Sequence, residues 1–178
     1  MSKNRSAVLT VTILLIILAA YEFPLLRFHG NAWIWGGPGL GYQIRMRAIP
    51  LNQPGVYEFH FRGIPDGDMS LMLYADGKTG ENREELTRFQ TRIGAVLIDQ
   101  HGNIICRAST TTGTGQADQI WNLESSYQEA AFWNSNCLNM SLNRSASYTL
   151  TLGISDVDPK TPETKLLPVL ESDQPVWP

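Results

Sequence analysis

Three histidines and two cysteines are the residues of this chain that could most readily support catalysis or metal binding. A nucleophilic cysteine needs a nearby base, and the spacing of His29, His60 and His101 ties none of them to Cys106 or Cys137. The histidines also lack the spacing of zinc ligands. The sequence therefore predicts no catalytic residue, no metal ion and no cofactor.

Acidic segments offer a second route to chemistry. Residues 66–68 and 156–158 each supply two carboxylates, but a calcium loop needs further ligands at fixed offsets and a late bidentate Glu. Glu84 and Glu85 could act as acid and base in glycoside hydrolysis only if the fold separated their carboxyl groups. The sequence has no serine-hydrolase, P-loop or dinucleotide signature. An unrecognised envelope hydrolase is therefore the least favoured function.

Four tryptophans are candidates for ligand binding, because an indole ring can stack on a sugar or fill a protein interface. Trp33 and Trp35 form a closely spaced pair, and Trp121 and Trp133 lie in an aromatic-rich segment. Exposed together, these side chains would favour a glycan or cell-wall ligand. The structural alternatives are packing in the core and, for the first pair, contact with lipid headgroups.

A second candidate binding patch is polar. Apolar and polar residues alternate over 42–48 and over 57–62, so each segment predicts a strand with one dry face. We expect the two strands to pair antiparallel, with Met46 facing Phe59. The same register pairs Arg47 with Glu58 and Arg45 with His60 on the solvent-exposed face. Solvated sheet surface is the simpler interpretation of such a patch.

The two cysteines are expected to form a disulfide, since both lie in the part of the chain predicted to be exported. A bond between Cys106 and Cys137 would close a loop of about thirty residues and contribute roughly 3–4 kcal/mol in the chain-entropy model. Two separate buried thiols are the alternative.

The first residues predict export. Lys3 and Arg5 precede an apolar or small run over 7–20, which is longer than many signal peptides and shorter than a full span. We interpret 1–27 as an uncleaved signal anchor that crosses the inner or plasma membrane through 7–26, with its N-terminus cytoplasmic. The domain would then be periplasmic or extracellular, and it would be secreted if the signal were cleaved.

Charge excludes one class of partner. Residues 1–27 carry a net charge of +2 and the remainder −5, out of −3 for the whole chain. Nucleic-acid binding needs a basic surface that neutralises phosphates, so no nucleic-acid partner is expected.

Further strands are expected over 70–75, 87–99, 104–108 and 148–154, with 100–103 as a hairpin turn. Segment 109–116, rich in threonine and glycine, predicts a flexible loop. The expected architecture is an all-β antiparallel sandwich, immunoglobulin-like or jelly-roll in order. Its divisions are an anchor (1–27), a mobile juxtamembrane linker (28–41), the sandwich (42–155) and a Pro-rich extended or disordered tail (156–178). Within the tail, 166–170 could dock on the domain.

No motif identifies a ligand, and the chain resembles no single family closely enough to transfer residues. The favoured function is a membrane-tethered, extracytoplasmic binding module with a protein partner, such as an envelope-assembly subunit or an immunity-type inhibitor. The alternative is a carbohydrate-binding module. The binding candidates are Trp33, Trp35, Arg45, Arg47, Glu58, His60, Trp121 and Trp133.

Overall fold

A computed structural model describes residues 8–16, 28–37, 41–75, 86, 88–113, 119–125 and 130–172. The described part is built almost wholly of strands, with a helix at 8–16 and a short 3-10 helix, η2. This confirms the prediction of an all-β fold. The elements are β1 (His29–Gly30), β2 (Ala32–Gly37), β3 (Gly41–Met46), β4 (Ile49–Pro50), β5 (Gly55–Arg62), β6 (Gly67–Ala75), β7 (Arg92–Asp99), β8 (Ile104–Gly113), β9 (Ile120–Ser125), β10 (Ala130–Trp133), η2 (Ser135–Cys137), β11 (Met140–Leu142), β12 (Ser147–Ser155) and β13 (Lys165–Glu171).

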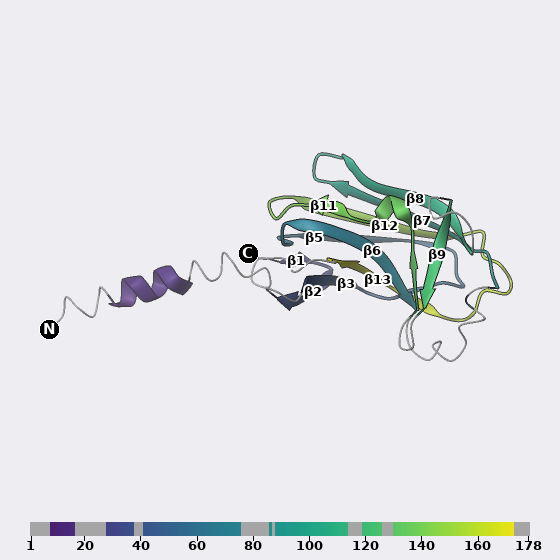
Figure 1. The fold of residues 1–178 in the computed structure, drawn as a ribbon, viewed down its shortest axis with the longest axis horizontal. Coiled ribbons are helices and arrows are strands. Elements are labelled where there is room, and N and C mark those ends of the chain that lie inside the picture. Colours follow the sequence, from purple (N-terminus) through teal and green to yellow (C-terminus); the bar gives the residue numbers. More distant parts are fainter. Residues whose placement is uncertain are drawn as a thin grey trace.

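The strands form one sheet in the order β1-β5-β12-β7-β8-β9-β10-β6-β13-β3-β2. Strands β11 and β4 pair beside this path with β6 and β13, and β8 runs parallel to β9. The expectation of two separate antiparallel sheets is corrected to a single sheet that nearly closes as a barrel (Figure 1). The two ends of the strand order, β1 and β2, are neighbours in the sequence, and one residue joins them.

That residue, Asn31, ties the two ends of the sheet together. Its backbone N–H donates to the His60 carbonyl oxygen at 3.1 Å, and its side-chain oxygen accepts from the His60 backbone N–H at 2.7 Å. Its side-chain amide donates to the Glu58 carbonyl oxygen at 3.2 Å. These bonds use backbone groups of β5 beyond the short β1 ladder, so segment 28–37 belongs to the sheet. The predicted mobile linker is wrong for these residues, and 38–40 lie outside the described part.

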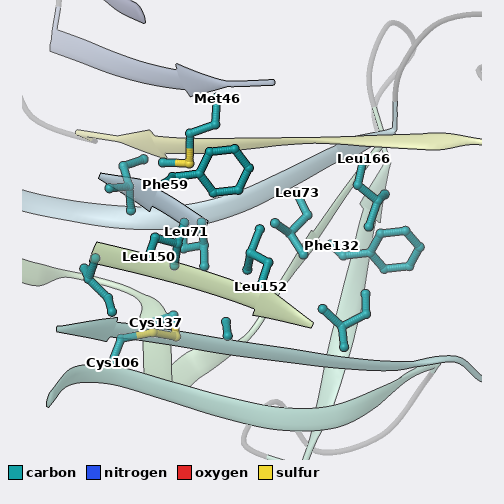
Figure 2. Packing of buried hydrophobic residues seen from close by; sticks show 14 of the residues in the cluster. Met46, Phe59, Leu71, Leu73, Cys106, Phe132, Cys137, Leu150, Leu152 and Leu166 are labelled. Atoms are coloured by element: carbon teal, nitrogen blue, oxygen red, sulfur yellow. A yellow bond between two sulfur atoms is a disulfide. The ribbon is translucent and has the colours of Figure 1, made fainter. Parts of the chain in front are cut away.

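The core lies between the opposed walls of this sheet. Side chains from β5, β6, β12 and β13 point into the interior in Figure 2, among them Phe59, Leu71, Leu150 and Leu166, and all four are fully buried. For β5 and β12, alternation in the sequence predicted the inner face correctly. Burial of this many large apolar side chains is the main favourable term for folding.

Strand pairing departs from the sequence prediction. The segment around Met46 pairs with β2 and β13, whereas β5 pairs with β1 and β12. The expected pairs of Arg47 with Glu58 and of Arg45 with His60 do not form. The β5–β12 ladder runs from Gly55 opposite Ile154 to Arg62 opposite Ser147, and this long set of backbone hydrogen bonds outweighs exposed charge pairs worth less than about 1 kcal/mol.

Two segments expected outside the sheet are part of it. Residues 109–113, predicted as loop, continue β8, and 114–116 lie outside the described part. In the Pro-rich tail, β13 lies between β6 and β3, which confirms the docking of 166–170. Leu166, Val169 and Leu170 are buried there. Burial of these apolar side chains stabilises a strand in a segment whose prolines predicted an extended or disordered tail.

The β7–β8 hairpin and the disulfide are both confirmed. The turn at 100–103 is closed by a bond from the Gly102 N–H to the Asp99 carbonyl oxygen at 3.0 Å. Cys106 on β8 is bonded to Cys137 in η2, with their Cα atoms 5.1 Å apart (Figure 2). The disulfide ties η2 to the sheet.

Among the residues that the structure describes, no helix has both the length and the apolar character of a membrane span. Residues 1–7 and 17–27 of the predicted anchor lie outside the described part.

Candidate functional site

The most prominent surface feature is a pair of exposed tryptophans on β2. Trp33 and Trp35 retain 63% and 71% of their accessible surface, and the alternation of a strand places both on its outer face. Trp33 lies directly opposite Arg45, and Trp35 directly opposite Gln43, across the β2–β3 ladder. Opposed residues of an antiparallel pair share a face, so these four side chains form one outward-facing group. We call it the tryptophan surface.

Close approach of β2 and β3 fixes the position of this group. Gly36, next to Trp35, has a φ of 113°, and a Cβ atom there would collide with the Gly41 carbonyl oxygen. A larger residue would therefore separate the two strands. Glycine at this position allows the indole of Trp35 to lie beside β3.

A chain of hydrogen bonds runs from the tryptophan surface to the neighbouring strands. The Arg45 guanidinium donates to the Gln43 side-chain oxygen at 3.0 and 2.7 Å, and the Gln43 amide donates to a Glu171 carboxylate oxygen at 3.3 Å. The Tyr74 hydroxyl donates to the same carboxylate at 2.9 Å. This hydrogen-bond network orients guanidinium, amide and carboxylate groups toward one region of the surface.

A pocket of about 330 Å³ opens beside Trp35. It offers an indole face together with donors and acceptors, which is the chemistry of a site for a polar ring or for a partner's side chain. Its lining residues are Trp35, Gly36, Gly41, Tyr42, Gln43, Arg45, Glu171 and Ser172.

The other two candidate tryptophans lie elsewhere. Trp121 on β9 is fully buried, and its indole N–H donates to the Ile93 carbonyl oxygen at 2.8 Å. Trp133 is half-buried on β10, opposite Met72 of β6. The structure therefore does not join the four tryptophans into one platform, and Trp121 is a core residue with a satisfied donor.

The polar candidates are also divided. Arg45 belongs to the tryptophan surface, and Arg47 is exposed just after β3. Glu58 and His60 lie on β5, where the His60 Nε2 is 3.8 Å from a Glu58 oxygen and its Nδ1 is 3.0 Å from the Thr149 hydroxyl.

Sequence reasoning missed three residues of the site: Gln43, Tyr74 and Glu171. Alternation over 42–48 places Gln43 on the solvent-exposed face of its strand, and nothing else in the sequence marks it as a binding residue. Tyr74 and Glu171 come together only because β13 pairs with β6, and the sequence placed Glu171 in a tail. No local pattern could have found this contact.

The acidic segments have structural partners. Asp66 accepts from the Arg144 backbone N–H at 2.6 Å and pairs with its guanidinium, and Arg92 pairs with Asp156 at 3.0 Å.

Hydrogen bonds from the backbone N–H groups of Lys160 and Gln90 lower the pKa of Asp158. No group of three or more potential metal ligands occurs in the described residues, while Glu84 and Glu85 lie outside them.

No protein-family model, curated protein or solved structure matches the chain.

Proposed function

We propose that this protein is an extracytoplasmic binding module whose tryptophan surface contacts a protein partner. One observation carries the proposal: Trp33 and Trp35 lie side by side on the outer face of β2 and are largely exposed. An exposed indole pair leaves a large apolar area in water. Trp and Arg are also enriched among the residues that dominate binding energy at protein interfaces.

The position of β2 adds to this support. Within the described residues β2 has a strand neighbour on one side only, β3. An edge strand presents backbone donors and acceptors to an extended segment of a partner. An envelope-assembly subunit or an immunity-type inhibitor would use such an edge, and no enzymatic activity is part of this proposal.

The location outside the cytoplasm rests on the N-terminal sequence. Basic Lys3 and Arg5 precede the apolar run, which favours a cytoplasmic N-terminus and an anchor through 7–26. The described helix at 8–16 has exposed apolar side chains and is drawn apart from the sheet in Figure 1. A lipid environment would cover such side chains. The buried disulfide suits an oxidising compartment.

The test is capture of a partner from envelope extract with the detergent-solubilised full chain as bait. A bait that lacks 28–37 would be unsuitable, because these residues form β1 and β2. The double variant Trp33→Ala/Trp35→Ala should lose the partner, whereas Ile104→Ala, which changes an exposed apolar residue on β8, should retain it. Equal capture by all three proteins would contradict the proposal.

A glycan ligand is the second candidate, and the pocket beside Trp35 is the observation that favours it. A sugar ring could stack on the indole while Gln43, Arg45 and Glu171 bind its hydroxyl groups. Retention of the full chain on cell-wall polysaccharide, lost in Trp35→Ala and kept in Trp33→Ala, would support this candidate. Loss in both variants would instead indicate a surface broader than the pocket.

A further inference from the structure

A second surface lies on β1, β5 and β12, away from the tryptophan surface. His29 is directly opposite Arg62, Arg62 is directly opposite Ser147, and His60 is directly opposite Thr149. Directly opposed residues of antiparallel strands point to the same face. Five side chains able to donate hydrogen bonds therefore project from one patch.

Burial along the strands confirms that this patch is the outer face. His29, His60 and Arg62 are exposed, whereas the intervening Phe61 and Tyr148 are buried and stack with ring centroids 6.0 Å apart. This aromatic contact joins the inner faces of β5 and β12. The polar side chains project from the opposite, outer face of the sheet.

The same residues line a pocket of about 330 Å³, at the end of β5 where β1 joins the sheet. Gly30, with a φ of 157°, allows β1 to approach β5 closely, because a Cβ atom there would collide with the His60 carbonyl oxygen. The pocket is lined by His29, Gly30, His60, Phe61, Arg62, Ser147, Tyr148 and Thr149.

The donor set suits a tetrahedral oxyanion. Arg62 carries a permanent positive charge in a planar group that matches phosphate geometry, and Ser147 adds a hydroxyl donor on the opposing strand. The ring of His29 can donate a further bond, whereas the His60 Nδ1 lies 3.0 Å from the Thr149 hydroxyl and its Nε2 faces Glu58. Charge-assisted hydrogen bonds of this kind are shorter and stronger than neutral ones.

Nearby carboxylates do not cancel this charge. Glu58 precedes Arg62 by four residues on β5 and lies 3.8 Å from the His60 Nε2, so it restricts an anion to the Arg62 end. Asp66 is paired with Arg144. Asp99 accepts from the His101 backbone N–H at 2.8 Å and from the Asn103 amide at 2.8 Å.

We propose that this pocket binds a phosphate group, carried either by an anionic membrane lipid or by a soluble phosphate ester. Its place in the chain favours the lipid, because only residues 21–28 separate His29 from the apolar run over 7–20. A headgroup bound there would orient the β domain on the membrane. This site is independent of the tryptophan surface, and a captured protein partner would neither support nor oppose it.

The soluble arm of the test is calorimetric titration of the full chain, held in a non-ionic detergent, with inorganic phosphate and with glycerol 3-phosphate. We expect saturable binding that weakens about tenfold or more in Arg62→Gln. Arg107→Gln, which removes an exposed arginine on β8, should leave it unchanged.

The lipid arm compares the same proteins in bilayer nanodiscs of phosphatidylcholine with and without phosphatidylglycerol. Hydrogen exchange at 60–62 and 147–149 should slow only when phosphatidylglycerol is present, and Arg62→Gln should abolish the change. Binding in the soluble arm alone assigns the site to a phosphate ester. Absence of saturable binding in both arms, or an equal loss in Arg62→Gln and Arg107→Gln, would overturn the proposal.

Discussion

Tryptophan has opposite surroundings in two regions of this molecule. Trp121 on β9 is fully buried, with its N–H bound to the Ile93 carbonyl oxygen, whereas Trp33 and Trp35 on β2 are mostly exposed beside Arg45 and Gln43. The first region uses the indole to fill the interior between sheet walls. The second leaves both indoles exposed to solvent. Residue type alone therefore does not distinguish a core tryptophan from a surface one. The surroundings of the indole depend on which face of the strand it occupies and on the residue opposite it in the neighbouring strand.

The sharpest test of this contrast is truncation of the buried indole. Trp121→Ala should lower the free energy of unfolding by about 3–5 kcal/mol, since it leaves a cavity and removes the hydrogen bond from the indole N–H to the Ile93 carbonyl oxygen. Denaturant unfolding followed by circular dichroism would measure the change. Trp33→Ala is the matched control and should lie within about 0.5 kcal/mol of the parent. A similar loss in both variants would remove the distinction between the two regions.

The disulfide belongs to the interior region and should give the next largest effect. Cys106 and Cys137 are separated by 31 residues, so the double variant Cys106→Ala/Cys137→Ala should be less stable by about 3–4 kcal/mol. Thermal unfolding with and without a reductant would measure this loss. The reductant should destabilise the parent and leave the double variant unaffected. An unchanged parent in full reductant would show that the bond does not stabilise the fold.

In the tryptophan surface, substitutions should change affinity rather than stability. Once a partner is identified, Trp33→Ala or Trp35→Ala should each weaken binding by about 2 kcal/mol, or roughly 30-fold in Kd. Surface plasmon resonance would give the Kd values, with Ile104→Ala as the control. Weakened binding accompanied by an equal fall in unfolding free energy would mean that these residues act through the fold.

The smallest effect concerns an exposed turn. Backbone hydrogen bonds from Lys160 and Gln90 lower the pKa of Asp158 in the folded state. Because the folded-state pKa is depressed, the stabilisation is complete above the unfolded value of about 3.9 and is lost as the pH falls through the folded value. Asp158→Asn should therefore be less stable than the parent at neutral pH, and Tm measurements should show the difference narrowing below about pH 4. A constant difference across this range would exclude the carboxylate as its cause.

Much of the local structure was predictable because it depends on neighbouring residues. Alternation correctly placed Phe59 and Phe61 inside and Glu58 and His60 outside. The hairpin turn at 100–103 followed from residues that tolerate tight turns. These features are set within a few residues of chain.

Strand partners and the candidate site were not predictable in this way. The contact of Tyr74 with Glu171 joins positions 97 residues apart, and alternation specifies a face without specifying its neighbour. For the same reason Trp35 and Trp121 looked alike in sequence. Only Arg45 and the Trp33–Trp35 pair could be selected as candidates, and their proximity depends on the β2–β3 register.

The position of β13 determines when this protein can finish folding. It is the last described strand to be synthesised, yet it lies between β6 and β3. Until residue 171 has been made, both neighbours lack their shared partner and expose unpaired backbone edges. A nascent chain therefore cannot assemble its sheet progressively from the N-terminus. A product that stops before Lys165 would expose two unpaired strand edges, which could pair with strands of other chains. The sheet can therefore be completed only after residue 171 has been made.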